Sequence, residues 1–146
     1  MQVDREPSDH KDGAVKTILV VDDDDDFRSV ISRVVTGMGF AVLQACSGNQ
    51  AFIVYAEHRP DLVIADLIMP DGEGLELIKH LRRADKQLKI IAITGGGRGG
   101  KTNYLFMAES LGADYTMEKP FSAQHLLSID RLAIGPEPAS PAIEIG

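Results

Sequence analysis

The sequence is poor in cysteine, in positive charge and in long apolar runs, and each shortage excludes a class of protein. Its single cysteine, Cys46, cannot form an intrachain disulfide, and we assign it no chemical role. The formal net charge of −7 argues against nonspecific nucleic-acid binding, because phosphate contacts require a surface rich in lysine and arginine. No apolar stretch approaches the roughly 18 residues that cross a bilayer, so we expect no membrane insertion. The polar first 16 residues lack the apolar centre of a secretory signal, which favours a cytoplasmic location.

What is present indicates one domain between two tails. A chain of 146 residues is long enough for one hydrophobic core of ordinary size and too short for two. Residues 1–15 are polar and charged, and residues 135–146 are rich in proline, which cannot continue a helix. We therefore expect a polar N-terminal tail, a folded domain over residues 16–134 and a proline-rich C-terminal tail.

Strand-like and helix-like segments alternate through the folded domain. Short runs rich in valine and isoleucine indicate strands that are buried on both faces. Between them, apolar residues recur at the spacings of three and four that are typical of amphipathic helices. This alternation predicts an α/β fold built of βαβ units around a mostly parallel sheet of five strands. The expected strands are residues 17–21, 41–45, 62–66, 89–93 and 114–117, and the last two helices are residues 102–111 and 122–133.

Local signals mark helix starts and the expected core. The aspartates at residues 24–26 suit the first turn of a helix, where negative charge is favoured. Ser47, with Gln50 three residues later, predicts a capping box. We expect the methionine and leucine side chains of the helices, Met107 and Leu126 among them, to lie in the core.

Charged and polar residues follow the expected strands at their carboxyl ends. Asp22 and Asp23 follow the first strand, Asp66 ends the third, and Thr94 and Lys119 follow the fourth and fifth. Open α/β sheets bind ligands at this edge. Three carboxylates that converge there repel one another unless a hard divalent cation lies among them, and Mg²⁺ suits a site without cysteine or histidine better than zinc. With the ammonium of Lys119 and the hydroxyl of Thr94, the set predicts phosphoryl transfer to a carboxylate.

Together these motifs resemble the receiver domain of bacterial two-component response regulators, the CheY-like family. The resemblance covers about residues 16–134 and rests on the joint order and spacing of the motifs. It implies a doubly wound (βα)5 receiver fold whose five-stranded parallel sheet has the strand order 2-1-3-4-5. The motifs are Asp22-Asp23, the segment Asp66-Leu67-Ile68-Met69-Pro70 with Gly74, Thr94, and Lys119-Pro120-Phe121.

The resemblance also implies roles for the acidic residues. Asp66 would accept a phosphoryl group from a phosphohistidine on a sensor histidine kinase or a histidine phosphotransfer protein. Asp23 and Asp66 would bind Mg²⁺ directly, Asp22 would bind it through water, and the backbone carbonyl of Ile68 would complete the protein ligands. The chain would then be a signalling switch that catalyses only its own phosphorylation and dephosphorylation, and not an enzyme with turnover.

A conformational switch is implied by the same resemblance. Lys119 would pair with the phosphoryl oxygens, and Thr94 would move inward to hydrogen-bond one of them. A downstream protein target would read the surface of the fourth helix, fifth strand and fifth helix. Thr116 stands where the family often has an aromatic switch residue, with Tyr115 one place earlier. Ile68 cannot orient a hydrolytic water, so we expect slow self-dephosphorylation.

Other interpretations remain open. The segment from Gly95 to Thr102 matches the phosphate-binding pattern G-x-x-x-x-G-K-[ST], although it follows the fourth strand of a small sheet and the remaining chain cannot form a nucleotide pocket. An interaction module that needs no phosphorylation could use the same fold, but such modules typically lose a site residue. The chain could also derive from a longer regulator. Because its proline-rich tail holds no DNA-binding motif, we expect a stand-alone receiver that acts through protein contacts, and a homodimer is compatible with the sequence.

Overall fold

The computed structural model describes residues 15–69, 73–95 and 101–135 of the chain. The two expected tails therefore lie outside the described residues, except for Val15 and Gly135. The segment from Gly95 to Thr102 that matches a phosphate-binding loop also falls largely outside them. The interpretations of these segments stay predictions.

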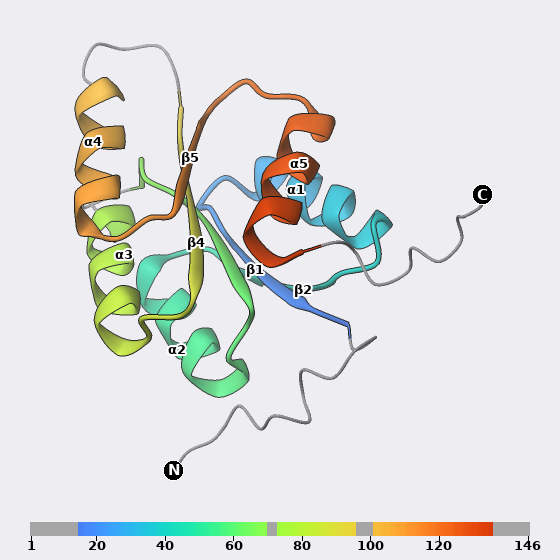
Figure 1. Ribbon diagram of the computed structural model, residues 1–146, viewed down its shortest axis with the longest axis horizontal. Coiled ribbons are helices and arrows are strands. Elements are labelled where there is room, and N and C mark those ends of the chain that lie inside the picture. The colour runs from blue at the N-terminus through green and yellow to red at the C-terminus, as the bar shows by residue number, and fades with distance from the viewer. Residues whose placement is uncertain (1–14, 70–72, 96–100, 136–146) are drawn as a thin grey trace.

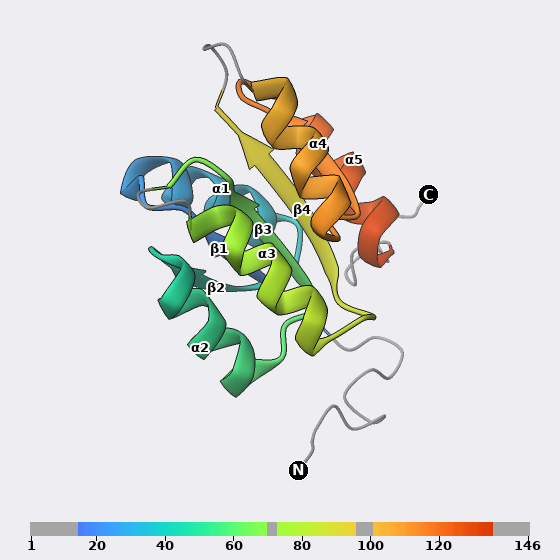
Figure 2. The ribbon, with the colours of Figure 1, turned by 90° about the vertical axis from the view of Figure 1, so that its left-hand side faces the viewer.

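Within the described residues, five strands and five helices alternate along the chain. The strands are β1 (Thr17–Val21), β2 (Ala41–Ala45), β3 (Leu62–Asp66), β4 (Lys89–Thr94) and β5 (Tyr115–Glu118). The helices are α1 (Asp25–Gly37), α2 (Gly48–His58), α3 (Glu73–Ala84), α4 (Lys101–Leu111) and α5 (Ala123–Ile134). The strands are parallel and have the order β2-β1-β3-β4-β5, which confirms the predicted fold. Figure 1 shows α1 and α5 on one face of the sheet and α2, α3 and α4 on the other, the face that Figure 2 turns toward the viewer.

The observed strands follow the predicted ones closely. The first three have the predicted bounds, β4 extends to Thr94, and β5 begins one residue later than predicted. Pairing explains the shift of β5, because Tyr115 is its first residue aligned with a partner, Ile91 of β4. Asp114 precedes this ladder, and its carboxylate instead accepts a hydrogen bond from the Ile90 N–H at 2.9 Å.

A hydrophobic core lies on each face of the sheet, and β3 contributes to both. Its residues Leu62 and Ile64 belong to the core covered by α1 and α5. Val63 and Ala65 belong to the core covered by α2, α3 and α4. All of β3 is buried, as expected for a continuous apolar strand in the middle of a parallel sheet. Its last residue, Asp66, is thereby carried to the carboxyl edge at the centre of the sheet.

The prediction of core residues in the last two helices is right for α5 and wrong for one residue of α4. Leu126 of α5 is buried, whereas Met107 of α4 is exposed. The inward position of α4 is taken by Ala108, which is fully buried. Met107 precedes it by one residue and so lies about 100° around the helix, where its side chain is open to solvent.

Side-chain caps fix the starts of α1 and α2. Asp24 caps α1, and its Oδ1 accepts a hydrogen bond from the N–H of Phe27 at 3.2 Å. Ser47 caps α2 by accepting a hydrogen bond from the N–H of Gln50 at 3.1 Å. The predicted capping box is only half formed, because Oε1 of Gln50 accepts from the N–H of the exposed Cys46, at 2.7 Å, and this residue precedes the cap.

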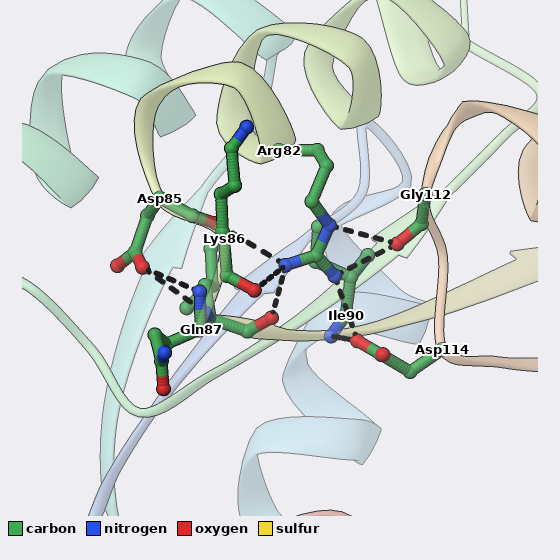
Figure 3. Close-up of polar contacts among 8 residues, drawn as sticks. Arg82, Asp85, Lys86, Gln87, Ile90, Gly112 and Asp114 are labelled. Carbon is green, nitrogen blue, oxygen red and sulfur yellow. Dashed lines mark hydrogen bonds and ion pairs between the residues drawn. The ribbon is translucent and has the colours of Figure 1, made fainter.

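Arg82 of α3 contacts the segments that lead into β4 and β5, at the edge of the sheet where these strands begin (Figure 3). Its guanidinium donates hydrogen bonds to the carbonyl oxygens of Leu88 and Gly112, both at 2.7 Å, and pairs with the Asp114 carboxylate at 2.8 Å. Gly112 has a φ of 123°, and a Cβ at this position would lie 2.7 Å from the Arg82 side chain, so glycine is required. Arg82 thus joins the ends of α3 and α4 at the edge opposite the predicted site.

Candidate functional site

The residues singled out in the sequence lie together at the carboxyl edge of the sheet. Asp22 directly follows β1, Asp66 ends β3 and Thr94 ends β4. Lys119 directly follows β5, and its backbone N–H donates a hydrogen bond to the Thr94 carbonyl at 2.9 Å. The parallel register therefore brings carboxylates, a hydroxyl and an ammonium to one place from four strands.

Three carboxylates form the acidic side of this site. One oxygen from each of Asp22, Asp23 and Asp66 lies within 4.8 Å of the others. Asp22 is 2% exposed and Asp66 is 4% exposed, whereas Asp23 is exposed. The buried Oδ2 of Asp22 accepts no hydrogen bond within the described ranges. An all-oxygen ligand set in which a buried carboxylate oxygen accepts no hydrogen bond fits a hard divalent cation such as Mg²⁺.

Lys119 is the cationic member of the site. Its Nζ lies 3.4 Å from Oδ2 of Asp66 and 3.5 Å from Oδ2 of Asp22. The same Nζ lies 3.8 Å from the centroid of the Phe27 ring. Phe121 packs edge-on against Phe27, with the two ring centroids 5.9 Å apart. The ammonium therefore bridges two carboxylates while it contacts an aromatic face.

The Asp66 carboxylate lies in surroundings that disfavour its charge. Burial raises the pKa of Asp66 to about 6, because desolvation penalises the ionised form. The N–H of Ile68, which donates to Oδ1 of Asp66 at 2.9 Å, opposes this rise in pKa by stabilising the anion. The charge of Asp22 raises the pKa further, and the charge of Lys119 lowers it. Lys119 thus compensates the negative charge only in part, and a bound cation would favour the ionised form.

Thr94 and Ile68 flank the acidic cluster in different ways. Thr94 is fully buried, and its hydroxyl donates a long hydrogen bond of 3.4 Å to a neighbouring carbonyl. The Ile68 side chain is 46% exposed, so an apolar group meets solvent two residues after Asp66. Thr116 lies half-buried on β5 and does not supply an aromatic ring at that position.

Gly74 allows α3 to begin directly beside the end of β3. A Cβ at this position would lie 2.5 Å from the carbonyl oxygen of Asp66 and 2.6 Å from the Cα of Leu67. Both separations are far below van der Waals contact, so a larger residue would force the backbone apart. The spacing of Asp66 and Gly74 in the sequence therefore has a steric reason.

Two residues in the first turn of α1 contact the site without a clear signal in the sequence. Phe27 belongs to the apolar stripe of its helix, a pattern that does not indicate contact with Lys119. Arg28 donates a hydrogen bond from Nη1 to the backbone carbonyl of Asp22 at 2.7 Å. The only sequence feature that could indicate a role for Phe27 and Arg28 is that they lie in the first helical turn after the acidic pair.

The fold and its acidic edge define a CheY-like doubly wound α/β protein. Residues 18–130 match the family described as the response regulator receiver domain, so the chain belongs to this family. This match confirms the resemblance seen in the sequence. Within the described ranges, none of the helices is both long and apolar enough to span a membrane.

Named relatives and solved structures support the same assignment. The chain is similar to the chemotaxis protein CheY of Bacillus subtilis, with 35% identity over 111 residues that cover 75% of this chain and 90% of that protein. It is also similar to the phosphate regulon transcriptional regulatory protein PhoB of Pseudomonas aeruginosa, with 32% identity over 134 residues. That match covers 90% of this chain but only 58% of PhoB. A solved receiver domain protein from Clostridium thermocellum superposes with a TM-score of 0.76 at 28% identity, over 82% of this chain and 94% of the other.

Membership of this family establishes the general role of the domain. Receiver domains of two-component response regulators are signalling switches and not classical enzymes. They receive phosphoryl groups from histidine kinases or phosphotransfer proteins, and they bind Mg²⁺ at an acidic pocket.

Proposed function

We propose that Asp66 is the phosphoryl acceptor of this receiver domain. The observation that carries the proposal is a buried carboxylate at the carboxyl edge of the sheet with the Lys119 ammonium 3.4 Å away. In the proposed step, an oxygen of Asp66 attacks the phosphorus of a phosphohistidine on a histidine kinase or phosphotransfer protein. The P–N bond breaks, its electron pair stays on the imidazole nitrogen, and an acyl phosphate forms on Asp66.

The acidic residues around Asp66 are proposed to hold Mg²⁺. Asp23 and Asp66 would be direct ligands, Asp22 would act through water, and the carbonyl of Ile68 would complete the set. The ion would supply positive charge for the phosphoryl oxygens. The Lys119 ammonium, which lies within 3.5 Å of carboxylate oxygens of Asp22 and Asp66, would also be close to the phosphoryl oxygens on Asp66. These residues position the phosphoryl group and exclude bulk water from the buried side of Asp66.

Thr94 is proposed to be the switch residue. Its hydroxyl makes only a 3.4 Å hydrogen bond to a backbone carbonyl in the described structure, and a bond of that length is weak and easily exchanged. A phosphoryl group on Asp66 would offer a charged acceptor, which forms stronger hydrogen bonds than a neutral carbonyl. Movement of Thr94 would then bias the surface of α4, β5 and α5, which a downstream protein target reads.

The exposed apolar side chain of Ile68 is proposed to slow self-dephosphorylation, because it cannot hydrogen-bond a hydrolytic water. We also propose that this receiver domain works in the cytoplasm, without a nucleic-acid partner or membrane insertion. These proposals rest on the charge and polarity of the sequence. Two tails around residues 16–134 belong to the same proposal, and a homodimer is compatible with it.

Intact-protein mass spectrometry tests the acceptor. Wild-type protein and Asp66→Asn are incubated with Mg²⁺ and acetyl phosphate or phosphoramidate under the same conditions. We expect the wild type to gain about 80 Da, the mass of one phosphoryl group, and Asp66→Asn to gain nothing. Asp26→Asn is the matched control, because Asp26 is an exposed carboxylate of the same acidic run, and it should gain mass like the wild type.

Two results would contradict the proposal. A mass gain in Asp66→Asn would place the acceptor on another residue. A wild type that binds Mg²⁺ but gains no mass, from the small donors or from a phosphorylated histidine kinase, would show that the fold serves only as a binding surface.

A further inference from the structure

Arg28 of α1 holds the loop that carries two of the acidic residues. Its side chain is only 16% exposed, although arginine is usually a surface residue. Nη1 donates a hydrogen bond of 2.7 Å to the backbone carbonyl of Asp22. Nε donates to Oε1 of Gln44 on β2 at 2.9 Å, and Nη2 donates to Oδ1 of Asp25 at 2.7 Å. One guanidinium therefore links the loop after β1 to a neighbouring strand and to the helix that follows.

The bond to the Asp22 carbonyl fixes the direction of the next residue. That carbonyl belongs to the planar peptide unit that also contains the nitrogen of Asp23. On the other side of Asp22, its own N–H donates to the Ala45 carbonyl at 3.1 Å. The peptides before and after Asp22 are therefore both held by hydrogen bonds from or to other elements. The peptide after Asp23 is held as well, because the N–H of Asp24 donates to Oδ1 of Asp22 at 2.9 Å. With both of its flanking peptides held, the Asp23 backbone, and so its Cα–Cβ bond, keeps one direction.

Asp23 depends on its backbone for position. It is exposed, and its carboxylate forms no hydrogen bond or ion pair within the described part of the chain. Asp22, by contrast, is buried, accepts the N–H of Asp24 at 2.9 Å and lies 3.5 Å from Lys119. A carboxylate without side-chain partners can converge with Asp22 and Asp66 only if the backbone aims it there.

We infer that Arg28 is a positioning residue that orients the Asp22–Asp23 peptide and thereby strengthens binding of a divalent cation by the three carboxylates. The inference rests on the proposed function of these carboxylates as the Mg²⁺ site. Groups that orient metal ligands from outside the coordination shell typically contribute a factor of 10 to 100 in metal affinity.

The charge of Arg28 makes the opposite prediction, so the two effects can be separated. A positive charge near a cation site weakens cation binding, and its removal by itself would make Mg²⁺ bind more tightly. In this structure the guanidinium is paired with the Asp25 carboxylate at 2.7 Å and meets the site only through a neutral carbonyl. We therefore expect the loss of positioning to outweigh the loss of repulsion.

Isothermal titration calorimetry with MgCl₂ measures the effect directly. We expect the Mg²⁺ affinity of Arg28→Met to fall about ten-fold relative to wild type. Arg28→Lys should give an intermediate affinity, because a single ammonium can reach the carbonyl but cannot also donate in the fixed fork that contacts Gln44 and Asp25. Arg33→Met, which removes an exposed arginine of the same helix, is the matched control and should leave the affinity unchanged.

A kinetic measurement distinguishes positioning of the cation ligands from a general loss of structure. The rate of phosphorylation by acetyl phosphate is measured for Arg28→Met across a range of Mg²⁺ concentrations. We expect the rate to recover to the wild-type value at saturating Mg²⁺, because the nucleophile Asp66 and Lys119 are untouched. A rate that stays low at saturating Mg²⁺ would show that Arg28 maintains the whole site and would overturn the inference.

The calorimetric outcomes also separate this inference from the proposed function. Wild-type affinity in Arg28→Met, or a tighter binding, would overturn the positioning role while the Mg²⁺ site itself stands. If wild-type protein binds no Mg²⁺, the proposed function fails and the inference fails with it. Urea unfolding of each variant shows whether a lowered affinity comes from unfolded protein.

Discussion

The Nζ of Lys119 lies 3.8 Å from the centroid of the Phe27 ring, and the same atom is within 3.5 Å of carboxylate oxygens of Asp22 and Asp66. A cation over an aromatic face is stabilised by the negative charge density of the ring. The edge contact with Phe121 in turn limits where the Phe27 ring can lie. The lysine that is proposed to meet the phosphoryl group is therefore oriented by α1 as well as by the acidic residues.

Replacement of Phe27 by leucine tests this contact. The change keeps an apolar side chain but removes the ring face, a contact that contributes about 1 kcal/mol. We expect phosphorylation by acetyl phosphate to slow by roughly five-fold, which corresponds to that energy, and Phe27→Tyr to retain most of the wild-type rate. Phe52→Leu, which changes a half-exposed ring on α2, is the matched control and should leave the rate unchanged. Equal rates for Phe27→Leu and Phe52→Leu would show that Lys119 does not need the ring.

Most of the fold can be predicted from the sequence because the strands of a doubly wound sheet are buried on both faces. A run such as residues 62–66 is continuously apolar until its last residue, so both the strand and its carboxyl end are visible. A charged residue at the end of such a strand can emerge only at the sheet edge, as Asp22 and Asp66 do. The same reasoning places Thr94 and Lys119 at this edge.

Individual side-chain contacts could not be predicted, because no pattern in the sequence encodes them. The ring of Phe27 beneath Lys119 depends on how α1 lies against the end of β5. The bond from Arg28 to the Asp22 carbonyl depends on side-chain direction within the first helical turn. The sequence pattern also does not show that α4 turns the small residue Ala108, and not Met107, toward the sheet. For this reason the prediction that Met107 lies in the core is wrong.

The close approach of Gly74 to β3 predicts a large effect of a single methyl group. In Gly74→Ala the new Cβ would meet the Asp66 carbonyl oxygen at 2.5 Å, so the start of α3 or the end of β3 must move. We expect a loss of about 1–3 kcal/mol in the free energy of unfolding and slower phosphorylation of the displaced Asp66. Gly37→Ala at the end of α1 is the control, since its Cβ would meet nothing within 4 Å. This control should be neutral or slightly stabilising, and urea unfolding curves of both variants at one pH would show the contrast.

Asp130 of α5 makes folding stability depend on pH. It is fully buried, and neither carboxylate oxygen has a hydrogen-bond partner within the described residues. Desolvation raises the pKa of Asp130 from 3.8 to about 7. Because the folded state holds the proton up to higher pH than the unfolded state, ionisation of Asp130 costs no folding free energy below about pH 4. The cost grows as the pH rises toward 7 and then stays at roughly 4 kcal/mol.

Asp130→Asn keeps the size of the side chain and removes the charge, so it isolates this effect. We expect its free energy of unfolding to match that of wild type near pH 4 and to exceed it increasingly up to pH 7. Asp26→Asn, at an exposed position in the first turn of α1, should not gain stability over wild type as the pH rises, because negative charge is favourable at the start of a helix. The comparison needs urea unfolding at several pH values in Mg²⁺-free buffer, because Asp66 also has a raised pKa and a bound cation would change its contribution. A constant difference between wild type and Asp130→Asn at all pH values would show that Asp130 is ionised or hydrated in the folded protein.

The apolar side chain of Ile68 predicts a long lifetime of the phosphorylated state. Its side chain is 46% exposed two residues after Asp66, and an isoleucine there can neither donate nor accept a hydrogen bond to an attacking water. A polar side chain at the same place can orient the attacking water. Complete general acid–base assistance typically contributes at least 100-fold, and orientation of the water is only part of it, so we expect roughly ten-fold faster decay in Ile68→Asn. Ile68→Leu keeps the apolar character and should decay like wild type. Intact-mass measurements after removal of the phosphoryl donor follow the decay, and wild-type protein that loses its phosphoryl group within seconds at neutral pH would exclude this role for Ile68.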